Sequence, residues 1–68
     1  MSGNTYRLTE LVGTSAESVE DAIKSAVEKA SATIHNMDWF QVAEVRGTIK
    51  DGAVSEFQVT MKVGFRVD

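Results

Sequence analysis

Residues 51–67, DGAVSEFQVTMKVGFRV, decide the fold because a tight-turn signal is followed by a strict alternation of apolar and polar side chains. Asp51-Gly52 is typical of a two-residue type I′ turn, which needs positive φ at both central positions. From Phe57 onward every second residue is apolar or aromatic, so one face of this strand points toward a core and the other away from it. The stretch therefore predicts the second arm of a β-hairpin, whose first arm precedes Asp51.

The turn also sets the pairing of the two arms, starting from Lys50 opposite Ala53. Carried along the hairpin, this register predicts three further pairs: Trp39 opposite Gly64, Phe40 opposite Val63, and Val42 opposite Met61. Phe40 and Val42 then share the face of the apolar row. The opposite face carries the first-arm residues Trp39, Gln41, Ala43 and Val45, with Gln58, Lys62 and Arg66 from the second arm.

The register places Glu44 and Arg46 on the apolar side, which is an awkward position for two charges. Either the strand runs past the end of the element that covers it, or a β-bulge turns both side chains outward. The sequence leaves these two alternatives open.

The first part of the chain predicts a strand followed by a helix. Residues 4–12 are rich in β-formers, and Gly13-Thr14-Ser15 interrupts them. Either Thr14 or Ser15 would cap the helix, and Thr14 with Glu17 forms a capping box. One apolar stripe at helical spacing follows, made of Val19, Ala22, Ile23, Ala26, Val27, Ala30 and Ile34. The stripe fades over residues 35–38, where we expect the helix to end.

The resulting β-α-β-β order belongs to the α+β class. A crossover through the helix makes the first two strands parallel, and the third strand fills the gap between them, antiparallel to both. We therefore expect a three-stranded antiparallel sheet partly wrapped on one helix. The other face of the sheet would stay bare although it holds the single tryptophan, which is typical of a protomer that assembles with copies of itself.

Length and composition lead to the same expectation. The 68 residues allow a single domain, spanning residues 1–68, whose own core is marginal. The chain has no cysteine and one histidine, so neither disulfides nor a multi-histidine metal site would stabilise it. No signal peptide or membrane span is evident, so we expect a cytoplasmic protein. The net charge of −3 argues against general attraction to nucleic acid.

Trp39 is the most informative single residue. It is either a core or interface tryptophan or a stacking platform for a flat ligand, and the glycine opposite it leaves room above the sheet. Gln58 is either a solvated polar residue or a donor and acceptor for the edge of a planar heterocycle. Lys62 and Arg66 either keep the strand soluble or contribute to phosphate binding, for which arginine offers a planar fork.

The sequence shows no catalytic machinery. His35 is best interpreted as a favourable cation at a helix end or as a plain surface residue. No carboxylates are held close by spacing, and the single histidine lacks the context of a nucleophilic triad. Gly13 and Gly47 do not form a phosphate-binding loop. These residues predict a small oligomer with a stacking site and no metal site.

Taken together, several short segments resemble the dodecin family. They are residues 11–15 (LVGTS), 38–40 (DWF), 46–47 (RG), 57–59 (FQV) and 63–66 (VGFR). The similarity extends from Tyr6 to Val67, and the Trp-Phe pair and the arginines resemble the bacterial branch. The resemblance implies a hollow homododecamer that binds flavin without being an enzyme.

The resemblance also implies roles for particular residues. Trp39 matches the tryptophan that sandwiches pairs of flavin rings at two-fold axes, and Gln58 matches the glutamine that hydrogen-bonds the ring. Arg46 and Arg66 match arginines at the phosphate region, which favours FMN over riboflavin; FAD, which also carries phosphate, stays open as an alternative. Some bacterial members also bind coenzyme A, for which the candidate residues here are Tyr6, Arg7, Lys29 and His35.

Two other classes of function remain as alternatives. A flavin-dependent oxidoreductase would need an acid, a base or a hydride-donor pocket beside the ring, and the sequence indicates none. A structural or interaction module could use the bare sheet for single-stranded RNA. Such modules combine several aromatic side chains with a basic groove, which this acidic chain with one tryptophan does not provide. We therefore expect storage or buffering of flavin, with no nucleic-acid or membrane partner.

Overall fold

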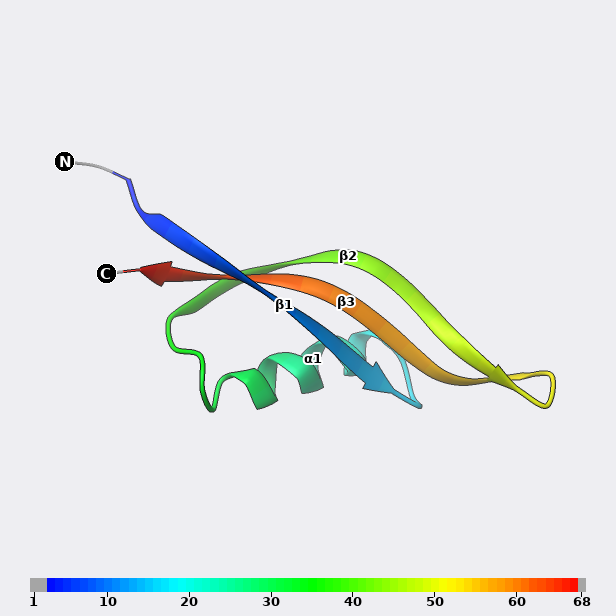
Figure 1. Ribbon diagram of the computed structural model, residues 1–68. Coiled ribbons are helices and arrows are strands. Elements are labelled where there is room, and N and C mark those ends of the chain that lie inside the picture. The colour runs from blue at the N-terminus through cyan, green and yellow to red at the C-terminus, as the bar shows by residue number, and fades with distance from the viewer. Residues whose placement is uncertain (1–2, 68) are drawn as a thin grey trace.

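The computed structural model describes residues 3–67, which form one helix and one three-stranded sheet. The elements are, in chain order, β1 (Thr5–Ser15), α1 (Val19–Ala30), β2 (Met37–Lys50) and β3 (Ala53–Val67) (Figure 1). β3 is the central strand and pairs antiparallel with both β1 and β2. The predicted order, class and central strand are confirmed. The outermost residues of the predicted 1–68 domain lie outside the described residues.

β1 runs three residues further than the sequence predicted, because Gly13 is part of the strand and does not end it. Gly13 pairs with Val59, and an added Cβ there would collide with the Ala22 carbonyl oxygen and approach the Ala26 Cβ to 2.8 Å. The glycine is therefore needed for the close approach of α1 to the sheet, which is a packing constraint.

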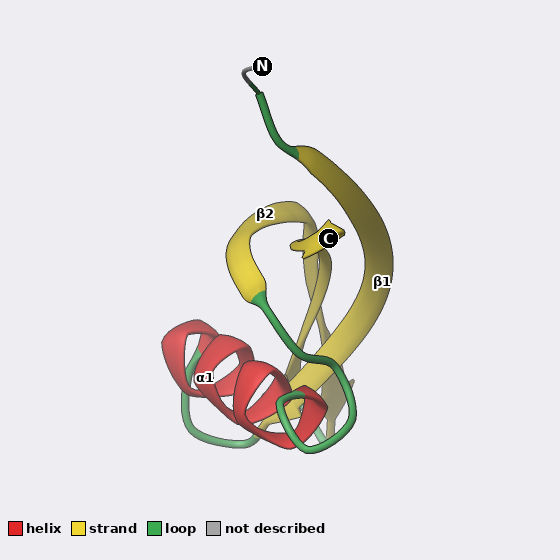
Figure 2. Cartoon of the chain, turned by 90° about the vertical axis from the view of Figure 1, so that its left-hand side faces the viewer, coloured by secondary structure: helices red, strands yellow, loops and turns green. Residues whose placement is uncertain are grey.

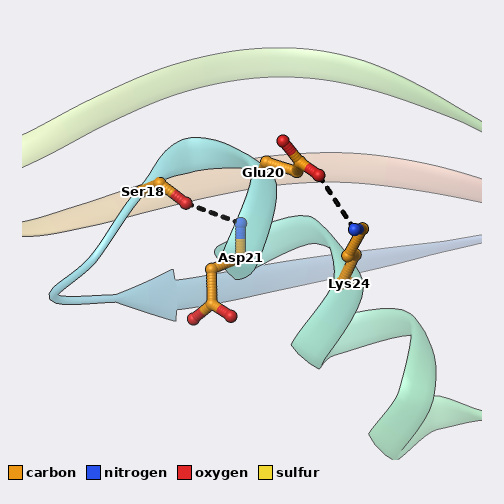
Figure 3. Close-up of polar contacts among 4 residues, drawn as sticks. All are labelled: Ser18, Glu20, Asp21 and Lys24. Atoms are coloured by element: carbon orange, nitrogen blue, oxygen red, sulfur yellow. Dashed lines mark hydrogen bonds and ion pairs between the residues drawn. The ribbon is translucent and has the colours of Figure 1, made fainter.

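The predicted helix cap is wrong, because Ser18 is the N-cap of α1. Its side chain accepts a hydrogen bond from the Asp21 amide at 3.0 Å (Figure 3). Ser15 instead supports the preceding turn: its Oγ donates to the Asp21 carboxylate and accepts from the amides of Glu17 and Ser18. Ser15 is buried, so these bonds satisfy a hydroxyl that water does not reach.

One exposed ion pair follows the cap. Lys24 Nζ lies 2.8 Å from Glu20 Oε2, one helical turn away (Figure 3). The pair lowers the pKa of Glu20 and raises the pKa of Lys24, mainly through the hydrogen bond and secondly through the opposite charge of the partner.

α1 ends at Ala30, earlier than predicted. The Ile34 amide still bonds the Ala30 carbonyl, but the chain turns away before residues 35–38.

The helix covers only part of the sheet. Its 12 residues span about 18 Å, whereas the 15 residues of β3 span about 50 Å. α1 packs on β1 and β3, on one side of the strands (Figure 2), and the β2–β3 hairpin extends beyond it (Figure 1). The radius of gyration is 14.2 Å, against about 11 Å for a compact domain of this length.

The core is correspondingly small. Among the described residues, the fully buried apolar side chains are Ala22, Val59, Met61 and Val63. The ten large apolar residues that stay exposed come from all three strands. A chain with this balance gains stability when partners cover those side chains.

The hairpin register changes twice between the turn and residue 42. Asp51 and Gly52 have φ of 53° and 80°, as the predicted type I′ turn requires. Between Thr48 and Ile49 the register shifts by one residue, with Ser55 of β3 left over; between Val42 and Glu44 it shifts back, with Ala43 of β2 left over. The two bulges offset one another, so the predicted pairs at residues 39, 40 and 42 are confirmed.

Between the two bulges, the side chains of β2 face the opposite side of the sheet from the one predicted. Arg46 pairs with Gln58 and Glu44 pairs with Thr60, so both charges turn away from the helix, and the bulge alternative is correct. Val45, predicted on the bare face, pairs instead with the buried Val59. That placement of Val45 was wrong because a bulge reverses every following side chain.

Candidate functional site

The site is built around Trp39, whose indole lies on the backbone of the central strand. Trp39 and Gly64 are direct cross-strand partners. A Cβ at Gly64 would collide with Cε2 and Cζ2 of the indole and come within 2.7 Å of its Nε1. The ring therefore occupies the space that any side chain at position 64 would fill. Trp39 is 41% exposed, so the seated ring still presents surface for another flat group.

Tyr6 packs against this indole from the other edge strand. The ring centroids are 6.1 Å apart and the planes meet at 63°, an edge-to-face contact. The Tyr6 hydroxyl donates a hydrogen bond of 2.9 Å to Oδ2 of Asp38. Asp38 is the extra residue of a third register shift, between Met37 and Trp39. A bulge of this kind re-aims a side chain, here toward Tyr6.

The environment of Tyr6 favours its neutral form. The hydrogen bond to Asp38 raises the pKa of Tyr6, and partial burial and the negative charge of Asp38 add to the effect. A hydrogen bond with Asn4 and the positive charge of Arg66 act in the opposite direction. The hydroxyl is therefore a donor throughout the neutral pH range.

Gln58 belongs to a second polar group, further along the sheet. Arg46 Nε donates to Gln58 Oε1 at 2.9 Å, and Gln58 Nε2 donates to Glu56 Oε1 at 3.3 Å. These contacts fix which way the amide points, and they leave one N–H of the amide and four N–H groups of the guanidinium for other partners. Gln58 and Arg46 thus form a donor-rich pair on the face that Trp39 also occupies.

The structure does not bring the predicted residues into one site within a single chain. Gln58 and Gly64 are six residues apart on β3, and at ~3.3 Å per residue this separates Gln58 from the Trp39 seat by about 20 Å. Arg66 lies at the Trp39 end, opposite Tyr6, while Arg46 lies at the Gln58 end. Lys62 is exposed between them.

The four candidates for a second ligand are all exposed and lie near the start of β1, the end of α1 and the loop before β2. Arg7 pairs with Phe65, on the opposite face from Tyr6. Lys29 is in the last turn of α1, and His35 precedes Asn36, whose carbonyl accepts from the Arg66 amide. Tyr6 differs from the other three because its ring and its hydroxyl are already engaged.

A separate apolar groove of about 300 Å³ lies on the helix side, between the start of α1 and the protruding hairpin. Its lining includes Val19, Val45, Phe57 and the exposed Ile49 and Val54.

In residues 3–67 no three acidic or histidine side chains are grouped so as to hold a metal ion. Nor does that part of the chain contain a helix with the length and apolarity needed to cross a membrane.

Two residues that take part in these contacts, Asp38 and Glu56, were not predicted from the sequence. Asp38 was noted only as part of a short segment, because its orientation depends on a bulge that leaves no sequence signal. Glu56 was not singled out as a candidate, although alternation places it two residues from Gln58 on the same face, which could have suggested the contact.

The fold and the indole seat together define a class: an open β-α-β-β protomer that presents one tryptophan on the bare face of its sheet. The Dodecin family model matches residues 5–68. The dodecin of Thermus thermophilus is 48% identical over 66 residues, which cover 97% of this chain and 96% of that protein.

Solved structures agree with this match. The dodecin of Streptomyces davaonensis superposes with a TM-score of 0.92 at 57% identity, covering 98% of each chain. The dodecin of Streptomyces coelicolor gives a TM-score of 0.93 at 51% identity, covering 100% of this chain and 97% of that one. The chain belongs to the dodecin family.

Proposed function

We propose that this protein binds flavin, with FMN as the preferred form, and stores it in a photochemically quiet state. The observation that carries the proposal is the seat of Trp39. The indole lies over Gly64 on the face that the helix leaves bare, with two-fifths of its surface exposed. A planar aromatic ring system is the ligand that such a platform suits.

The remaining groups fit the same ligand. The oriented amide of Gln58 offers both a donor and an acceptor to the polar edge of a flavin ring. Arg46 and Arg66 supply positive charge and planar forks suited to a phosphate, which favours FMN. When bound, flavin would supply a ring that light can excite, and the electron-rich indole of Trp39 is the group placed to quench it.

The separation of about 20 Å between Gln58 and the Trp39 seat requires a second copy of the chain. A two-fold axis repeats the same patch on both subunits, and in the assembly we propose the axis brings Trp39 of one copy beside Gln58 of the other. The exposed apolar residues and the small core support assembly into the closed dodecamer that the resemblance implies. One tryptophan per chain then supplies both sides of a sandwich.

The primary experiment adds FMN to the purified protein and follows the fluorescence of the flavin. We expect quenching in the wild type and little quenching in Trp39→Ala. The matched control is Val12→Ala, because Val12 is exposed on the same face but lies opposite Thr60, away from the seat. Equal quenching in Trp39→Ala and the wild type would refute the proposal, as would NADH turnover by the loaded protein.

We propose coenzyme A as a second ligand, held by the exposed basic groups of Arg7 and Lys29 with His35. Isothermal titration with coenzyme A tests this. Loss of the binding heat in an Arg7→Ala and Lys29→Ala double variant, with FMN quenching retained, supports a separate site. The absence of any heat in the wild type contradicts it.

A further inference from the structure

Tyr6 and Asp38 connect the two edge strands across the central one. β1 and β2 share no backbone hydrogen bonds, because β3 lies between them. The Tyr6 side chain nevertheless reaches over β3 and bonds Asp38 on β2. This bridge passes directly beside the indole of Trp39, whose ring centroid is 6.1 Å from that of Tyr6.

The local backbone explains why this contact forms. Tyr6 is opposite Arg66 on β3, two residues from Gly64, so its ring lies on the same face and one row away from the indole. Asp38 is the unpaired residue of the bulge that immediately precedes Trp39. A hydrogen bond to Asp38 therefore constrains the backbone from which the indole projects.

We propose that Tyr6 is a positioning residue that, with Asp38, clamps the indole of Trp39 in its stacking orientation over Gly64. The Tyr6 ring closes one edge of the platform, and its hydroxyl ties β1 to the bulge of β2. The function that this clamp serves rests on the proposed flavin binding, but the clamp itself exists without any ligand. It also gives Tyr6 a role at the indole in place of the coenzyme A contact that the resemblance suggested.

The clamp has a physical advantage for a stacking site. An indole that is two-fifths exposed has rotamers available that swing it off the sheet, and binding a ring on top of it would then cost the entropy of fixing it. An edge-to-face neighbour and a charge-assisted hydrogen bond restrict those rotamers before the ligand arrives. Preorganisation of this kind increases affinity without adding a contact to the ligand.

The sequence offers a clean reporter, because Trp39 is the only tryptophan and Tyr6 the only tyrosine. The experiment uses the full-length, flavin-free protein. It measures near-ultraviolet circular dichroism and acrylamide quenching of Trp39 emission in the wild type, Tyr6→Phe, Asp38→Asn and the double variant. Thr60→Val is the matched control, since it also removes a hydroxyl from the bare face, at a position opposite Glu44 and away from the indole.

We expect both single variants to reduce the tryptophan dichroism and to raise the quenching constant about twofold or more, and the control to leave both unchanged. Because the two residues act as one unit, the double variant should match the singles and not their sum. Wild-type values in Tyr6→Phe, or additive effects in the double variant, would overturn the proposal.

Two further measurements keep the test decisive. If Tyr6→Phe does not fold, Asp38→Asn alone decides: the ultraviolet titration of Tyr6 should then move to lower pH, together with the change in Trp39 dichroism. An unmoved titration would refute the bridge. FMN should bind about three- to thirtyfold more weakly to Tyr6→Phe, the range expected for losing one hydrogen bond to a charged group at a partly exposed site. Tryptophan dichroism that is unaltered in the variants would contradict the clamp, whereas absence of FMN quenching in the wild type would contradict the proposed function.

Discussion

Replacing Gly64 with alanine tests the indole seat without altering Trp39 itself. The three atoms nearest to the added Cβ all belong to the Trp39 side chain, and the approach to Nε1 would be 2.7 Å. The backbone of β3 can keep its course, and the indole must lift away. We therefore expect the substitution to separate flavin binding from folding.

Two opposing contributions determine the expected change in the free energy of unfolding, and a third determines the change in the Kd for FMN. Alanine in a strand is favoured over glycine by about 0.5–1 kcal/mol. Lifting the indole exposes roughly 40 Å² of apolar surface, worth about 1 kcal/mol, so the free energy of unfolding should change by less than about 1 kcal/mol. Each displaced stack loses about 0.5–1.5 kcal/mol. A two-fold sandwich contains two such stacks, so the Kd for FMN should rise roughly 5- to 150-fold.

The assay pairs FMN fluorescence titration with thermal unfolding, and Gly13→Ala is the control glycine. At Gly13 the added Cβ meets the Ala22 carbonyl oxygen of α1, so the helix must move, and overpacking of this kind costs about 1–3 kcal/mol. Gly13→Ala should therefore melt earlier and still bind FMN below its transition. Wild-type FMN affinity in Gly64→Ala, with Trp39 emission unchanged, would show that the seat does not support binding.

Three further predictions concern stability. Ser15→Ala removes a buried hydroxyl with three hydrogen bonds and should lower the free energy of unfolding by about 1–3 kcal/mol. This loss should exceed the ~1 kcal/mol expected for the N-cap variant Ser18→Ala. The reverse order in denaturant titration would contradict the assignment of the cap and the turn. Met61→Ala should cost about 2–5 kcal/mol, because this side chain is fully buried in the small core, and a smaller loss by calorimetry would mean that the core collapses around the gap. The raised pKa of Tyr6 stabilises the fold fully below the ordinary tyrosine pKa of about 10, and this contribution is lost as the pH rises through the folded-state pKa. Asp38→Asn should therefore make the free energy of unfolding depend less on pH in that range. An unchanged pH dependence would refute the linkage.

The sequence predicted the fold well where one local signal dominates. Asp51-Gly52 predicts both the turn and its positive φ values, and the alternation from Phe57 predicts the buried face of β3. The position of Trp39 opposite Gly64 was also predicted correctly. That success depends on two bulges on opposite strands whose one-residue offsets cancel before residue 42.

What the sequence could not predict depends on tertiary contacts. Gly13 appeared to break a strand because the close approach of Ala22 is not visible in a local pattern. The cap moved from Thr14 or Ser15 to Ser18 because Ser15 is buried in the turn and its hydroxyl is used there.

The paired bulges of the hairpin have a consequence for how this surface can change through evolution. Between Ala43 and Ser55 the two arms are offset by one residue, so the side of the sheet that each residue of this segment faces is decided by the bulges. Removing both bulges would extend the register of the turn through this segment and transfer Arg46 to the helix side of the sheet, with no substitution at residue 46. Gain or loss of such an offsetting pair of bulges is therefore a route to new ligand contacts, because it re-sorts several side chains while the pairs on either side stay fixed.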